Sequence, residues 1–134
     1  MAIRALPALV LALAVQAEAA DQRTPLRGVS AVRIANYGTP SRVIEGREQI
    51  VSIVGELNGL RKKPWQRGDA KLSCYSSVFL LSGKKTLGEF RITAEQVVER
   101  PVEKGQSSYN LAIGEADIPG IRKLLAEIPP AKGC

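Results

Sequence analysis

The most concentrated group of side chains able to bind a ligand surrounds the single tryptophan. Arg61, Lys62 and Lys63 precede Trp65, and Arg67 follows it. Because Trp and Arg are enriched at interaction hot spots, the segment is a candidate contact loop for a partner protein, or for anionic lipid or glycan. The alternative is structural: the cations would close the C-terminus of a helix, and Trp65 would fold back over the edge of the core.

Catalytic patterns are sparse. The chain has no histidine, which removes the commonest general base, the commonest metal ligand and every His-based triad. Ser82 and Lys85 have the spacing of a Ser–Lys nucleophile pair, but Gly83 and the flanking strand patterns predict a hairpin turn there. We therefore predict a non-enzymatic protein without catalytic residues, cofactor or metal. A His-independent hydrolase is the alternative.

The first nineteen residues have the pattern of a secretory signal peptide. Arg4 supplies a positive charge, residues 5–15 are apolar, and Ala17-Glu18-Ala19 is a small-x-small cleavage pattern. The apolar run is shorter than the roughly 20 residues of a membrane span, although an uncleaved anchor or a buried helix is the alternative. We predict a cleaved signal at 1–19, a flexible lead-in at 20–27 and one domain at 28–134, with nothing spanning the membrane after cleavage.

The two cysteines, Cys74 and Cys134, both lie in the predicted mature chain. An even count in an exported protein favours an internal disulfide, which would close a loop of about 60 residues. Two free thiols, or a bridge to another chain through Cys134, are the alternatives.

The net charge of +6 constrains the partner. Removing residues 1–19 takes away one arginine and one glutamate, so the charge is unchanged. Export to the bacterial periplasm or the exterior makes nucleic acid an improbable partner. An acidic envelope or extracellular protein, anionic lipid or glycan fits better, and plain solubility explains the charge equally well.

Two amphipathic helices are predicted. Residues 47–61 carry apolar side chains at the spacing of one helical face, and Pro64 ends the segment. Residues 118–128 repeat the pattern, with Asp117 as the predicted N-cap.

Alternating patterns predict the strands. A long strand at 70–81 is followed by a turn at 82–85 and a strand at 86–92 that continues, irregularly, to 100. Shorter strands are predicted at 28–36, 41–44 and 107–113. The expected fold is α+β: an antiparallel sheet of four to five strands with both helices on one face, in the order β-(β)-α-β-β-β-α.

The other face of this sheet is a second candidate surface. If Leu72, Cys74, Val78 and Leu80 point to the core, then Tyr75, Ser77 and Phe79 point outward, with Glu89 and Arg91 beside them. Such a face is also ordinary in antiparallel sheets, and the reverse register would suit Phe79.

The sequence thus favours an exported binding module: a periplasmic inhibitor, immunity or accessory factor for another protein. The alternative is an envelope binder of anionic lipid or glycan that uses the tryptophan segment. The candidate partner contacts are Arg61, Lys62, Lys63, Trp65, Arg67, Tyr75 and Arg91. The sequence does not define the oligomeric state.

Overall fold

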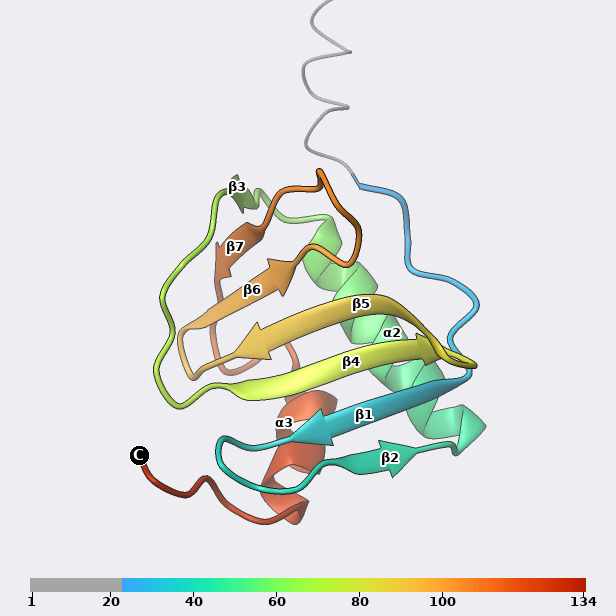
Figure 1. Ribbon diagram of the computed structural model, residues 1–134, viewed down its shortest axis with the longest axis vertical. Helices are drawn as coiled ribbons and strands as arrows, with labels where there is room; N and C mark the ends of the chain where they lie inside the picture. Colours follow the sequence, from blue (N-terminus) through green and yellow to red (C-terminus); the bar gives the residue numbers. More distant parts are fainter. Residues whose placement is uncertain (1–22) are drawn as a thin grey trace, which may run out of the picture.

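The computed structural model describes residues 23–134. The predicted signal peptide, its cleavage site and residues 20–22 of the predicted lead-in therefore lie outside the described residues. One sheet and two helices make up the fold (Figure 1). Within the described range no helix has the length and apolar character needed to cross a membrane.

The sheet has seven strands rather than the predicted four to five, and every pairing in it is antiparallel. The order is β2-β1-β4-β5-β6-β7-β3. The strands are β1 (Ala31–Ala35), β2 (Arg42–Ile44), β3 (Gln66–Arg67), β4 (Ser76–Ser82), β5 (Lys85–Ile92), β6 (Gln96–Arg100) and β7 (Tyr109–Ala112). The prediction missed β3 because a strand of two residues has no alternation to detect. It also merged β6 with β5, which a turn at Thr93–Glu95 separates.

The helices are α2 (Arg47–Arg61) and α3 (Pro119–Glu127), and both lie on the same side of the sheet (Figure 1). The α+β class and the two helices are therefore confirmed. The core between the layers is continuous and includes Val32, Ile34, Val78, Leu80 and Phe90 from the sheet with Ile53, Leu57, Leu60 and Ile121 from the helices. Each such side chain contributes about 1.5–3 kcal/mol by leaving water, which is what holds the helices on the sheet.

The predicted long strand is shorter than expected. Val78 and Leu80 face the core as predicted, but β4 begins only at Ser76, so Leu72 and Cys74 are not part of it. Cys74 has a φ of +55°, a left-handed conformation that interrupts an extended strand.

The predicted disulfide is confirmed: Cys74 is bonded to Cys134, with the two Cα atoms 5.7 Å apart. The tail after α3 is held a second time where the Lys132 amide donates a 2.8 Å hydrogen bond to the Tyr37 carbonyl. The C-terminus is therefore attached to the segment between β3 and β4 and to the turn after β1.

The start of α3 is capped differently from the prediction. Asp117 is not its N-cap; the Glu56 carboxylate, from α2, accepts hydrogen bonds from the amides of Gly120 and Ile121 at 2.7 and 2.8 Å. A carboxylate is favourable at this end of the helix dipole, and here it also joins the two helices. Asp117 instead accepts a 2.7 Å hydrogen bond from the Gly114 amide and lies 3.2 Å from Lys63.

Asp117 predicts a pH effect on stability. The Gly114 hydrogen bond, and then Lys63, lower the pKa of Asp117 below its ordinary value of 3.8. A carboxyl group with a lowered folded-state pKa stabilises the fold fully above its unfolded value and loses that contribution as the pH falls through its folded value. We expect the free energy of unfolding, measured with urea at a series of pH values from neutral to below 3.8, to fall more steeply for wild type than for D117N. Parallel curves for the two proteins would contradict this role.

Candidate functional site: an arginine pocket

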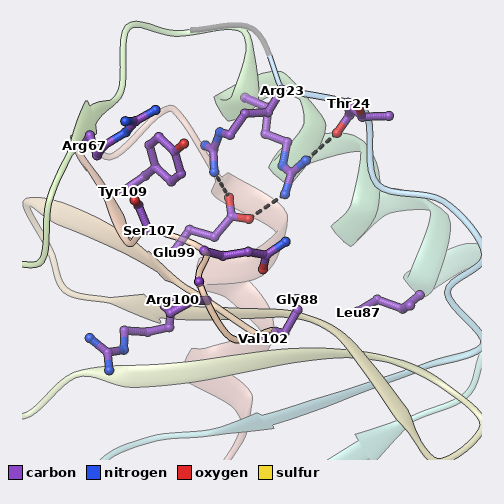
Figure 2. Close-up of a pocket in the computed structure, with 14 residues that line it drawn as sticks. Arg23, Thr24, Arg67, Leu87, Gly88, Glu99, Arg100, Val102, Ser107 and Tyr109 are labelled. Carbon is purple, nitrogen blue, oxygen red and sulfur yellow. Dashed lines mark hydrogen bonds and ion pairs between the residues drawn. The ribbon is translucent and has the colours of Figure 1, made fainter. Parts of the chain in front are cut away.

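A hollow lies where the ends of β6 and β7 meet the C-terminus of α2 and the residues before β1 (Figure 2). Its volume is about 600 Å³, within the range of small-molecule sites. We call it the arginine pocket, after the charged and aromatic side chains that define it: Arg23, Arg61, Arg67, Arg100, Glu99 and Tyr109.

Glu99 lies at the base of the arginine pocket. In the sheet it is paired with Phe90 on one side and Tyr109 on the other, so it points to the helix side of the sheet. Only 9% of the residue is exposed. A buried carboxylate requires compensating charge, and two arginines supply it.

The two arginines bind different oxygens of Glu99 (Figure 2). Arg23 donates to Oε1 at 2.7 Å, and Arg61, from the last turn of α2, donates to Oε2. Arg61 also donates to the Thr24 carbonyl, which fixes the chain segment that carries Arg23. Each guanidinium therefore has its position set by the same carboxylate.

Arg23 is enclosed by aromatic rings. Its guanidinium carbon lies 4.6 Å from the centroid of the Trp65 ring and 4.2 Å from that of Tyr109. Burial lowers the pKa of Arg23, and the charge of Glu99 opposes that shift. An arginine keeps its charge under such conditions, and cation–π contacts stabilise it between the two rings.

Trp65 supports this arrangement from within the core. It is 7% exposed, and its indole N–H donates a 2.6 Å hydrogen bond to the Leu60 carbonyl. The structure thus places Trp65 as the alternative interpretation had it, folded back against the end of α2.

Arg67 and Arg100 line the open part of the arginine pocket. Arg67, on β3, is exposed, lies 6.0 Å from the Tyr109 ring, and has no ion pair with any residue from 23 to 134. Arg100 is half-buried and pairs with Asp69. The pocket lining therefore holds four guanidinium groups and a single carboxylate, Glu99.

The predicted contact residues do not form one surface. Arg61 and Arg67 line the arginine pocket, whereas Lys62 and Lys63 are exposed outside it. Tyr75 and Arg91 come together elsewhere: the Arg91 guanidinium lies 4.8 Å from the Tyr75 ring, and Tyr37 packs edge-on against the same ring at 6.3 Å.

Four of the side chains that define the arginine pocket were absent from the predicted contact residues: Arg23, Glu99, Arg100 and Tyr109. For Glu99 a signal existed, because it alternates with Val97 and so shares the inward face of its strand. The lead-in gave no sign that Arg23 would be buried.

The chemistry available at the arginine pocket is anion binding. Acidic and sulfur side chains between residues 23 and 134 do not gather into any group of three or more that could hold a metal ion. Comparison with protein-family models, curated protein sequences and solved structures gives no match for this chain.

Proposed function

We propose that this chain is an exported, non-enzymatic binding module that receives an acidic group of a partner protein in the arginine pocket. One observation carries the proposal: four guanidinium groups converge on a 600 Å³ hollow whose lining includes a single carboxylate. Export rests on the signal-peptide pattern of residues 1–19.

The arginines of the pocket differ in whether they are already paired with a carboxylate, and this difference supports an acidic ligand. Glu99 binds Arg23 and Arg61 and thereby neutralises part of their charge. Arg67 remains without a counter-ion among the described residues, beside the half-buried Arg100. A planar guanidinium can bind a carboxylate through two parallel hydrogen bonds, so Arg67 is the residue best placed to capture an incoming Asp or Glu.

A protein partner accounts for the net charge as well as for the pocket. With a net charge of +6, the chain attracts acidic proteins over a distance set by the ionic strength. Such complementarity raises association rates and selects the partner's charge, as an inhibitor, immunity or accessory factor requires.

The test uses R67E with R47E as its matched control. R47E makes the same change in net charge at the far end of α2, outside the arginine pocket. For a fluorescent poly-glutamate peptide, we expect R67E to weaken binding about tenfold or more, because like charges would meet in the pocket. R47E should bind within about twofold of wild type, since an exposed distant charge is largely screened.

The same assay separates the alternative function. Vesicles containing phosphatidylglycerol and an anionic polysaccharide are tested beside the peptide. Binding to either of these without binding to the peptide would favour docking on the envelope surface through the exposed Lys62 and Lys63. An equal loss in R47E and R67E would show that only net charge matters and would overturn the proposed site.

A further inference from the structure

The sheet has a second face, opposite the helices and away from Glu99 (Figure 1). Over β1, β4 and β5 it presents Ala31, Arg33, Ala35, Ser77, Phe79, Leu81, Thr86, Glu89 and Arg91, all half-buried. We call this the open sheet face. It ends at β6, where Val98 is fully buried.

Opposite charges flank an aromatic ring at the centre of the open sheet face. In the hydrogen-bonded register, Arg33 pairs with Phe79, and Phe79 pairs with Glu89. The Arg33 guanidinium lies 4.7 Å from the Phe79 ring, and Glu89 lies 3.3 Å from Arg91 on its own strand. One row across three strands is therefore positive, aromatic and negative.

This row is complementary to itself. If two copies face each other across a twofold axis that runs along β4, then β1 of one copy lies over β5 of the other. Arg33 then faces Glu89 of the second copy, the same pair forms again on the other side of the axis, and the two Phe79 rings meet at the centre.

The neighbouring rows fit the same operation. Ala35 and Arg91 pair with the same residue of β4, Ser77, so the axis places the small Ala35 opposite Arg91 of the second copy. Facing sheets in sandwiches cross at about 30°, which moves a position one strand from the centre by only about 2.5 Å. Long arginine and glutamate side chains can span that shift.

We propose that the open sheet face is the interface of a homodimer held by two reciprocal Arg33–Glu89 pairs around Phe79. A second copy is favoured over a different protein because the row of Arg33, Phe79 and Glu89 is complementary in charge to its own twofold-related copy. The arginine pocket lies on the helix side of the sheet at Glu99 and Tyr109, so both pockets of the dimer stay accessible. This inference does not depend on the proposed function.

Charge reversal tests the interface directly by sedimentation over a concentration series. R33E and E89R should each weaken dimerisation about 100-fold, since each places two like-charge pairs in the interface and one such pair costs at least about tenfold. The double variant R33E/E89R restores opposite charges and should dimerise within about threefold of wild type. R42E, on the other face of the sheet edge, is the matched control and should leave dimerisation unchanged.

S77E gives a second route if R33E disturbs the packing on Phe79. In its own chain the new carboxylate lies beside Arg91, whereas across the axis it meets its own copy. Loss of the dimer in a folded S77E protein supports the proposal. A wild type that is monomeric at every concentration, or a dimer that resists all these reversals, overturns it and leaves the open sheet face to a different protein.

Discussion

E99Q is expected to destabilise the domain by about 3 kcal/mol or more, because it removes the one carboxylate that compensates two buried arginines. The side chains of Arg23 and Arg61 are only 14% and 13% exposed, so water that enters the arginine pocket can replace only part of the lost charge. The substitution preserves shape and volume, which separates the loss of charge from the loss of packing.

The burial of Arg23 and Arg61 makes this cost larger than that of an ordinary ion pair. The Arg23 Nε and Nη2 and the Arg61 Nε already lack hydrogen-bond partners within the described part of the chain. Without Glu99, two neighbouring positive charges would have no counter-ion and only limited contact with water, which is strongly unfavourable.

Urea unfolding of E99Q, with D69N as the control, measures the effect. Asp69 is also an ion-paired carboxylate, bound to Arg100, but its side chain is 56% exposed. D69N should cost less than about 1 kcal/mol, as exposed pairs do. The double variant R23M/E99M should be much less destabilised than E99Q, since it leaves one fewer unpaired charge. Equal losses for E99Q and D69N would show that the Glu99 cluster is not a buried charge network.

The sequence predicted α2 to the residue because independent local signals agree there. Its apolar spacing marks the buried face, Glu48 lies in the first turn, Arg61 in the last, and Pro64 prevents continuation. The strands were less predictable, since whether residues 93–95 continue β5 or turn into β6 depends on contacts with other strands.

The arginine pocket could not be predicted from local sequence patterns either, because it also depends on contacts between distant parts of the chain. Arg23 and Glu99 are 76 positions apart in the chain, and only the register of β5, β6 and β7 brings them together. Trp65 was correctly recognised as unusual, but no local signal decided between a contact residue and a core residue. In the fold, the Trp65 indole donates a hydrogen bond to the Leu60 carbonyl, and Arg23, which lies outside the segment, packs over its ring.

The open sheet face was predicted in part. Phe79 and Ser77 do alternate with the core residues Val78 and Leu80, so their outward direction follows from strand geometry alone. The placement of Arg33 on one side of Phe79 and Glu89 on the other required the pairing of β1 and β5 with β4. Alternation in the sequence predicts the face of the sheet to which a side chain points. Its neighbours on adjacent strands depend on how the strands pair in the fold.

Removal of the disulfide is the second change for which we expect a large loss of stability. The variant C74A/C134A is expected to lose about 4 kcal/mol of stability, because the bridge spans 60 positions and restricts the unfolded chain. Reduction of the wild type should give a similar loss. The effect acts mainly on the unfolded state, so it does not require the bridge to pack against the core.

A local effect should accompany the global one. After α3, the tail is held by the bridge, by the Lys132–Tyr37 hydrogen bond and by a 3.0 Å hydrogen bond that the Asn36 side-chain amide donates to the Pro129 carbonyl. Without the bridge, the part of the tail beyond Pro129 depends on the Lys132–Tyr37 hydrogen bond, which contributes only about 1 kcal/mol, too little to hold a chain end continuously. Hydrogen exchange at the Lys132 amide should therefore approach the rate of an unstructured amide, whereas the core strands β4 and β5 should remain protected at the level of the reduced global stability.

Urea unfolding of oxidised wild type, reduced wild type and C74A/C134A measures the global effect. The reduced protein and the double variant should agree, which separates loss of the covalent link from the side-chain change. S73A, adjacent to Cys74 and exposed, is the matched control and should change stability by less than about 0.5 kcal/mol. If oxidised and reduced proteins unfold at the same urea concentration, the bridge does not stabilise the fold. If only the Lys132 amide changes its exchange rate, its effect is confined to the C-terminal tail.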